Sequence, residues 1–215
     1  MYLPAVAPIR DMHLIPTNDE VLALLRETGA LRDGHFEYPG GVHANEYLQM
    51  ALAFRYFQNA KILSVGLSRR LRANPELRAM IKELSIVCPA IGGLPIAYGL
   101  SEALRVHQVY WAEPEGDDKS LRFRQYLQQT PGEKVLLVDD ILRSGRRLTQ
   151  LRQLVESNGA TVVGIAVAMY QPNPSVADFG SLPLHYLAKM DAVYYRNSAS
   201  CDLCKRLVPL EKIWV

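Results

Sequence analysis

The sequence predicts an α/β fold with a doubly wound, mostly parallel sheet. Two long apolar runs, Lys134–Val138 and Thr161–Met169, are typical of strands that are buried on both faces of a parallel sheet. The residues between the runs predict an amphipathic helix, because apolar side chains recur there every three or four positions (Leu148, Leu151, Leu154 and Val155). A strand, a helix and a strand in this order form a right-handed βαβ unit by default. Strands and helices alternate from Ser85 onward, which favours the doubly wound arrangement.

The segment before this unit predicts further strands and helices of the same sheet. Ser85–Cys88 is a short apolar strand, and it leads into a turn at Pro89–Gly93. Leu94–Ala103 continues as a helix. Two more strands joined by a polar loop are expected after it: strand Gln108–Ala112, loop Glu113–Ser120 and strand Leu121–Tyr126.

The N-terminal part predicts a helix followed by a small hairpin and two more helices. Asn18–Thr28 is amphipathic, with Asn18 as the expected N-cap and Gly29 at its end. Ala30–Gln49 is richer in glycine and aromatic residues and predicts a short hairpin or loop. Helices are expected at Tyr47–Phe57 and Lys61–Arg72.

Composition narrows the class of protein. The 215-residue chain is 49% hydrophobic and 21% charged, which is ordinary for a globular protein, and its net charge of +2 does not favour a nucleic acid or an anionic membrane. The longest uncharged run, Leu84–Leu100, contains two prolines and several glycines, which is unfavourable for a membrane helix. Three cysteines form no disulfide framework, and no secretory signal is recognisable. We expect a cytoplasmic protein.

Residues that can bind a ligand follow the end of the predicted strand Lys134–Val138. Asp139 and Asp140 follow the strand directly, and a loop with Gly145 leads into the next helix. Ligands of open α/β sheets bind at the carboxyl ends of the strands, and a helix N-terminus favours an anion. Adjacent carboxylates can accept hydrogen bonds from vicinal sugar hydroxyls. The pattern predicts a site for a sugar phosphate.

Three arginines strengthen this prediction. Arg143, Arg146 and Arg147 lie at the beginning of the helix, where positive charge opposes the helix dipole. A bound anion would compensate for this placement. The alternative is a solvated strand end followed by a basic helix start with no ligand.

The segment Val135–Arg147 resembles the phosphoribosyl pyrophosphate (PRPP) motif of type I phosphoribosyltransferases: an apolar strand, two acidic residues, two apolar residues and a glycine turn. The other matching segments narrow the resemblance to bacterial orotate phosphoribosyltransferases. They are Thr28–Leu31, Gly34–Phe36, Gly41–His43 with Tyr47 and Gln49, Pro89–Gly93, Pro131–Val135 and the tail Cys201–Leu210.

The resemblance implies roles for these residues. Asp139 and Asp140 would be catalytic and would hold the ribose hydroxyls. The PRPP ribose and 5′-phosphate would contact the whole motif: Asp139, Asp140, Ile141, Leu142, Arg143, Ser144, Gly145, Arg146 and Arg147. The pyrophosphate loop would be Ala90, Ile91, Gly92 and Gly93, and a mobile loop would contribute Lys119 and Arg122. Mg²⁺ would bind mainly through PRPP oxygens and water, so no side chain is assigned to it.

The resemblance also implies a reaction and an assembly. PRPP would condense with a nucleobase, orotate by default, to give orotidine 5′-monophosphate and pyrophosphate, in a homodimer. Arg143 and Thr149 stand at base-facing positions where orotate enzymes have other residues, and Glu113–Ser120 is more acidic than the corresponding loop. Two alternatives therefore stay open: a phosphoribosyltransferase for another base, and a PRPP- or nucleotide-binding regulatory homologue without transfer activity.

The expected organisation is a small N-terminal helix and hairpin lid (residues 1–60), a phosphoribosyltransferase core (61–190) and a C-terminal tail that packs on the core or on a dimer partner (191–215). The tail contains Cys201 and Cys204 in a C-x-x-C pattern, which lacks the four ligands of a structural zinc site. A structural remnant is the simple interpretation, and a metal site shared across a dimer is the alternative. His35 and His43 in the lid are expected either to be structural or to contact a ligand.

Overall fold

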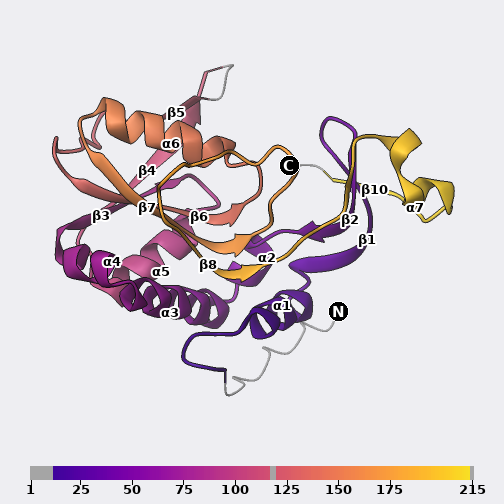
Figure 1. Ribbon diagram of the computed structural model, residues 1–215, viewed down its shortest axis with the longest axis horizontal. Helices are drawn as coiled ribbons and strands as arrows, with labels where there is room; N and C mark the ends of the chain where they lie inside the picture. Colours follow the sequence, from indigo (N-terminus) through magenta and orange to yellow (C-terminus); the bar gives the residue numbers. More distant parts are fainter. Residues whose placement is uncertain (1–11, 117–119, 214–215) are drawn as a thin grey trace.

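The computed structural model describes residues 12–116 and 120–213, and it contains two β-sheets (Figure 1). The larger sheet has six strands: β3 (Leu84–Pro89), β4 (Val109–Glu115), β5 (Ser120–Arg122), β6 (Lys134–Leu142), β7 (Thr161–Tyr170) and β8 (Leu184–Lys189). Their order is β5-β4-β3-β6-β7-β8. Every neighbouring pair is parallel except β4 and β5, which form an antiparallel hairpin.

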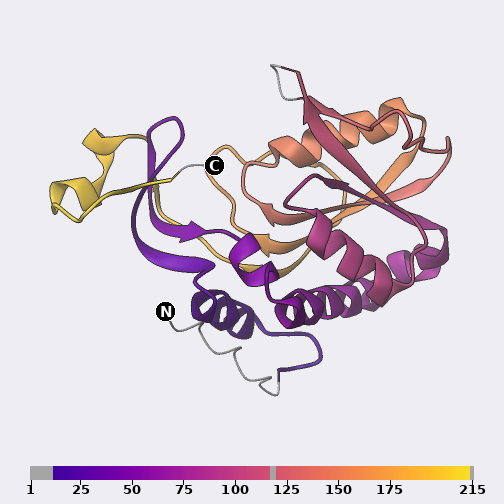
Figure 2. The same cartoon turned by 180° about the vertical axis from the view of Figure 1, so that it is seen from behind.

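Helices cover both faces of this sheet. Helices α3 (Phe57–Ala73) and α5 (Leu94–Leu104) lie on one face and α6 (Arg146–Ser157) on the other, as Figures 1 and 2 show. Side chains along β6 alternate between the two layers: Leu136 and Val138 pack on the α3 and α5 side, and Val135 and Leu137 on the α6 side. This arrangement confirms the predicted doubly wound, mostly parallel sheet.

The smaller sheet joins the N-terminal and C-terminal parts of the chain. It contains β1 (Leu31–Tyr38), β2 (Val42–Leu48), β9 (Tyr194–Tyr195) and β10 (Glu211–Lys212), in the order β10-β1-β2-β9. Two short helices, η2 (Ser198–Ser200) and α7 (Asp202–Lys205), connect β9 to β10. The predicted hairpin at Ala30–Gln49 is therefore the centre of a sheet that the C-terminal tail completes on both sides.

Several helices and strands begin or end at other residues than the sequence predicted. Helix α1 (Asn18–Glu27) is capped by Thr17, not Asn18: the Thr17 hydroxyl accepts from the Glu20 backbone N–H, and Glu20 accepts from the Thr17 backbone N–H. The predicted helix Tyr47–Phe57 was wrong. Tyr47 and Leu48 end β2, and the helix there is the short α2 (Ala51–Phe54).

The remaining elements complete the core. Helix α4 (Pro75–Met80) and the 3₁₀ turn η1 (Ile81–Glu83) connect α3 to β3. Strand β6 runs four residues further than the apolar run that predicted it, so Asp139 and Asp140 lie within the strand. Within residues 12–116 and 120–213, no helix combines the length and the apolar character that a membrane crossing requires.

Candidate functional site

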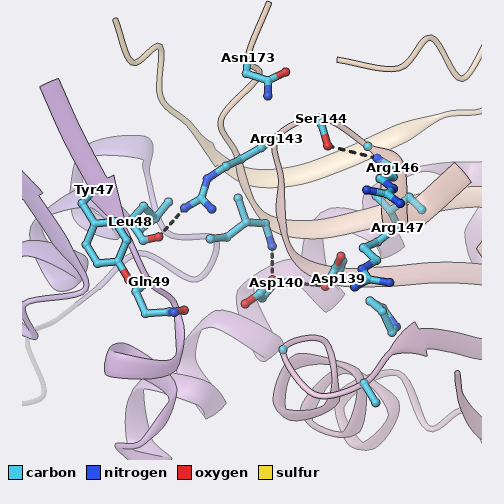
Figure 3. A pocket seen from close by; sticks show the side chains of 16 residues that line it. Tyr47, Leu48, Gln49, Asp139, Asp140, Arg143, Ser144, Arg146, Arg147 and Asn173 are labelled. Atoms are coloured by element: carbon cyan, nitrogen blue, oxygen red, sulfur yellow. Dashed lines mark hydrogen bonds between the residues drawn. The ribbon is translucent and has the colours of Figure 1, made fainter. Parts of the chain in front are cut away.

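A cleft of about 420 Å³ lies at the carboxyl end of β6 (Figure 3). The end of β2 and the residues just after it (Tyr47–Gln49) lie on one side, and the turn that leads into α6 lies on the other, with Asp140 between them. The lining residues outside Tyr47–Gln49 are Pro89, Ala90, Gly92, Asp139, Asp140, Ile141, Arg143, Ser144, Gly145, Arg146, Arg147, Leu148 and Asn173. The position agrees with the rule that α/β sheets bind ligands at the carboxyl ends of their strands.

The two aspartates form the acidic floor of the cleft. Asp139 is only 7% exposed, and its Oδ1 accepts a hydrogen bond of 2.9 Å from the backbone N–H of Asp140. Asp140 Oδ1 accepts one of 2.7 Å from the backbone N–H of Ile141. Burial raises the pKa of Asp139 well above its usual value, and the neighbouring Asp140 charge raises it further. Burial also raises the pKa of Asp140. A ligand that donates hydrogen bonds would stabilise both carboxylates.

The turn after β6 presents the N-terminus of a 12-residue helix to the cleft. Gly145 precedes α6 with φ of +75° and has no side chain to cap the helix, and the Ser144 hydroxyl oxygen accepts a hydrogen bond of 3.3 Å from the backbone N–H of Arg146. A Cβ at this position would lie 2.9 Å from the Phe179 ring and 3.0 Å from Ala177. Glycine is therefore required by both backbone conformation and space. The helix dipole and the backbone N–H groups of the first helical turn make this turn suitable for an anion.

The three arginines of the motif have different positions. Arg146 is exposed, and Arg147 is half-buried, where its charge opposes the raised pKa of Asp139. Arg143 points away from the turn: its Nη2 donates to the carbonyl oxygen of Leu48, and its Nε donates to Gln171 Oε1 at 2.8 Å. Figure 3 shows Arg143 extending toward Leu48, on the side of the cleft opposite Arg146 and Arg147.

The expected pyrophosphate loop is partly in the cleft. Ala90 and Gly92 line it, and a Cβ on Gly92 would lie 3.1 Å from an Asp140 carboxylate oxygen. Because Gly92 has no side chain, the loop can approach Asp140 closely. Ile91 is 82% exposed and Gly93 directly precedes α5, and both lie outside the lining.

Other expected site residues lie outside the cleft lining. Leu142 is buried, and the Thr149 hydroxyl donates to the Gly145 carbonyl oxygen at 3.0 Å within α6. Lys119 lies outside the described residues. Arg122 forms an ion pair of 3.3 Å with Glu115 on the β4–β5 hairpin, and Arg124 pairs with Glu113 at 2.5 Å. Of the two basic residues that we expected near pyrophosphate, Arg122 is thus paired with an acidic neighbour.

Sequence reasoning assigned no cleft role to Tyr47, Gln49 or Asn173. Tyr47 and Gln49 come from the smaller sheet, and Asn173 comes from the loop after β7. The position of Asn173 beyond the end of a predicted strand was a usable signal, since neighbouring parallel strands end at the same edge. His35, His43, Cys201 and Cys204 lie away from the cleft but close to one another.

Comparisons with known proteins identify the family. Residues 58–178 match the phosphoribosyl transferase domain. Curated relatives include the orotate phosphoribosyltransferase of Carboxydothermus hydrogenoformans, 32% identical over 90% of this chain and 95% of that protein. The enzyme of the same name from Thermotoga petrophila is 31% identical over 88% of this chain and 94% of that protein.

Solved structures show the same fold. The crystal structure of orotate phosphoribosyltransferase from Aeropyrum pernix matches with a TM-score of 0.64 at 20% identity, over 79% of this chain and 93% of that chain. That from Mycobacterium tuberculosis H37Rv, in complex with inorganic phosphate, matches with a TM-score of 0.57 at 18% identity, over 80% and 95% of the two chains. Sequence match, fold and cleft agree: the chain belongs to the phosphoribosyltransferase family and is similar to the orotate phosphoribosyltransferases within it.

Proposed function

We propose that this protein transfers the phosphoribosyl group of PRPP to orotate and releases pyrophosphate. The observation that carries the proposal is the pair Asp139 and Asp140 on the cleft floor, between a glycine turn at a helix N-terminus and the Pro89–Gly92 loop. The names of the relatives support orotate as the base.

The lining residues fit the parts of PRPP in order. The backbone of Ser144–Arg147 receives the 5′-phosphate, with Arg146 and Arg147 supplying positive charge. Asp139 and Asp140 accept hydrogen bonds from the ribose hydroxyls, and Ala90 and Gly92 lie beside the pyrophosphate. The base then lies toward Tyr47–Gln49 and Arg143, the end of the cleft opposite the turn.

The reaction exchanges two bonds at ribose C1. The bond from C1 to the pyrophosphate oxygen breaks and pyrophosphate leaves with the electron pair. The ring nitrogen of orotate gives up its proton to solvent and donates an electron pair to C1 from the opposite face. Positive charge develops on the ribose between these events, and the two carboxylates stabilise it. Positioning of both substrates in one cleft supplies most of the remaining acceleration.

Orotate carries a carboxylate, which needs a cation in a partly buried site. Arg143 is half-buried at the base end of the cleft, and it is the arginine of the motif that turns toward the smaller sheet. We assign it to the orotate carboxylate. Thr149, whose hydroxyl is bonded within α6, takes no part.

Mg²⁺ fits the chemistry of the cleft, since the carboxylates of Asp139 and Asp140 are oxygen donors, which this ion prefers. Bound together with PRPP, it would supply positive charge to the pyrophosphate oxygens. Asp139 and Asp140 hold the ribose side of that assembly.

A homodimer is part of the proposal. A groove of about 700 Å³ runs beside α3 and α5, and Phe57 and Tyr98 on its edge are 70% and 52% exposed. Large apolar side chains that gather on a surface are typical of an interface. A second copy of the chain would cover them.

Pyrophosphate release tests the proposed reaction. The protein is mixed with PRPP, Mg²⁺ and a panel of bases that includes orotate. Release that depends on orotate is the expected result. Release with another base only would show that orotate is not the substrate. PRPP binding by calorimetry without any turnover would show that the protein binds PRPP but is not a transferase. Loss of PRPP binding in Asp139→Asn/Asp140→Asn is the control for the site.

A further inference from the structure

Two histidines and two cysteines from opposite ends of the chain converge beside the smaller sheet. His35 lies in β1, His43 in β2, and Cys201 and Cys204 at the beginning and inside of α7. One nitrogen or sulfur atom from each of the four lies within 4.8 Å of all the others. Three of the side chains are buried, and that of Cys204 is half-buried.

The nitrogen–sulfur distances in this cluster are close to those of a zinc site. His35 Nε2 lies 3.4 Å from Cys201 Sγ and 3.5 Å from Cys204 Sγ, and His43 Nδ1 lies 3.4 Å from Cys204 Sγ. A tetrahedral zinc ion with Zn–N of about 2.0–2.1 Å and Zn–S of about 2.3 Å separates nitrogen from sulfur by about 3.6 Å and nitrogen from nitrogen by about 3.3 Å. The two nitrogens here are 2.8 Å apart, so a small displacement of the rings completes the tetrahedron.

The second nitrogen of His35 fixes its orientation. His35 Nδ1 lies 2.9 Å from the carbonyl oxygen of Val208, which can only accept a hydrogen bond. Nδ1 therefore carries the proton, and the Nε2 lone pair points to the two sulfurs and to His43. A carbonyl that holds the outer nitrogen of a ligand histidine is a common feature of zinc sites.

The backbone also brings His35 into the cluster. The pairing of β1 with β2 shifts its register between Asp33 and Phe36, so His35 lies in an irregular part of the strand. His35 and Phe36 are both buried there, although neighbouring residues of a regular strand face opposite sides. Such irregularities redirect side chains and are frequent at sites.

We propose that His35, His43, Cys201 and Cys204 bind one zinc ion within a single chain. Thiolate and imidazole ligands suit zinc among the common divalent metals. Four protein ligands leave no open position, so the ion is structural and not catalytic. It fastens the C-terminal tail to the β1–β2 hairpin. The end of β2, at Tyr47 and Leu48, lines the cleft. This proposal does not depend on which base the protein uses.

Metal analysis of the whole protein is the first test. The protein is produced with zinc available, kept reduced and exchanged into metal-free buffer, and its zinc content is measured by inductively coupled plasma mass spectrometry. One zinc per chain is expected. In Cys201→Ser/Cys204→Ser the zinc content should fall at least tenfold, whereas His107→Asn, at an exposed histidine outside the cluster, should keep it. Zinc retained in the double variant would overturn the assignment.

A second test uses the unmodified chain, because the double variant could fail to fold. Zinc is removed with a chelator and replaced by Co²⁺, and the expected result is an absorption spectrum of tetrahedral cobalt with thiolate ligands. Chelation should also lower the melting temperature and make Cys201 and Cys204 reactive toward a thiol reagent. A reduced protein that takes up neither metal would show that the four side chains form only a hydrogen-bonded cluster. A Cys201–Cys204 disulfide in the protein as produced would show that the two cysteines are an oxidised pair and not zinc ligands.

Discussion

Arg143, directly after β6, donates a hydrogen bond to the main-chain carbonyl oxygen of Leu48 at the end of β2. Its guanidinium also lies 5.7 Å from the centre of the Tyr38 ring. This side chain therefore connects the six-stranded sheet to the smaller sheet across the cleft. The connection leaves positive charge at the end of the cleft where the base is proposed to bind.

Replacing Arg143 should separate the binding of the two substrates. In Arg143→Gln we expect the KM for orotate to rise about 30-fold, equivalent to roughly 2 kcal/mol, because a buried carboxylate loses its cation. The KM for PRPP should change much less. Arg146→Gln, at the exposed start of α6, is the matched control and should affect PRPP more than orotate. Kinetics with each substrate varied in turn measure both, and a selective loss for PRPP in Arg143→Gln would refute the assignment.

Asp139→Asn should stabilise the free protein and abolish PRPP binding. The pKa of Asp139 is raised in the folded protein because burial and the Asp140 charge disfavour its ionised form. Asparagine keeps the oxygen that accepts the Asp140 N–H without the buried charge. We expect a higher melting temperature at neutral pH and no heat of PRPP binding by calorimetry.

The gain in stability of Asp139→Asn over the unmodified protein should change with pH in a defined direction. A carboxyl group with a raised folded pKa binds more protons in the folded than in the unfolded protein, so stability falls as the pH rises above the unfolded pKa of about 3.9. The advantage of Asp139→Asn should therefore be absent below that pH and grow as the pH rises toward the folded pKa. An advantage that is constant with pH would show that charge is not its cause.

The sequence was informative where the site is contiguous. Asp139, Asp140 and Gly145 lie in one strand, turn and helix, and the local pattern predicted this order of elements, although it ended the strand at Val138. The sugar-phosphate chemistry of these residues stays a prediction. Arg143 was also singled out, but its direction could not be predicted, since it depends on Leu48 and Gln171, which other parts of the chain supply. The same holds for Tyr47 and Asn173 in the cleft lining.

Elements that depend on tertiary contacts were predicted less well. The N-cap of α1 is a separate case, because Thr17 and Glu20 form a T-x-x-E capping box, which is a local pattern that the sequence contains. The C-x-x-C pattern showed only two ligands in the sequence, because His35 is 166 residues away from Cys201. The pairings of β2 with β9 and of β1 with β10 bring the tail to the hairpin. No local pattern carries that information.

The proposed homodimer makes a prediction for Phe57. This side chain is 70% exposed on the groove beside α3 and α5, and an arginine there would place charge in an apolar interface. Phe57→Arg should shift the protein from dimer to monomer in analytical ultracentrifugation. Leu14→Arg, at an equally exposed apolar residue outside the groove, should remain dimeric. Dissociation of both variants, or of neither, would place the interface elsewhere.

Gly145 and Gly132 allow backbone strain to be separated from ligand binding. Both have a positive φ, +75° and +84°, so alanine at either position costs about 1–2 kcal/mol of stability. At Gly145 the new methyl group would also meet Phe179 and Ala177, which adds about 1–3 kcal/mol, whereas no described atom lies within 4 Å of the corresponding position at Gly132. Gly145→Ala should therefore lose more stability in urea unfolding than Gly132→Ala. Because the crowded turn is the proposed phosphate site, Gly145→Ala should also weaken PRPP binding by calorimetry, and Gly132→Ala should not. Equal PRPP affinity in the two variants would mean that the 5′-phosphate binds away from this turn.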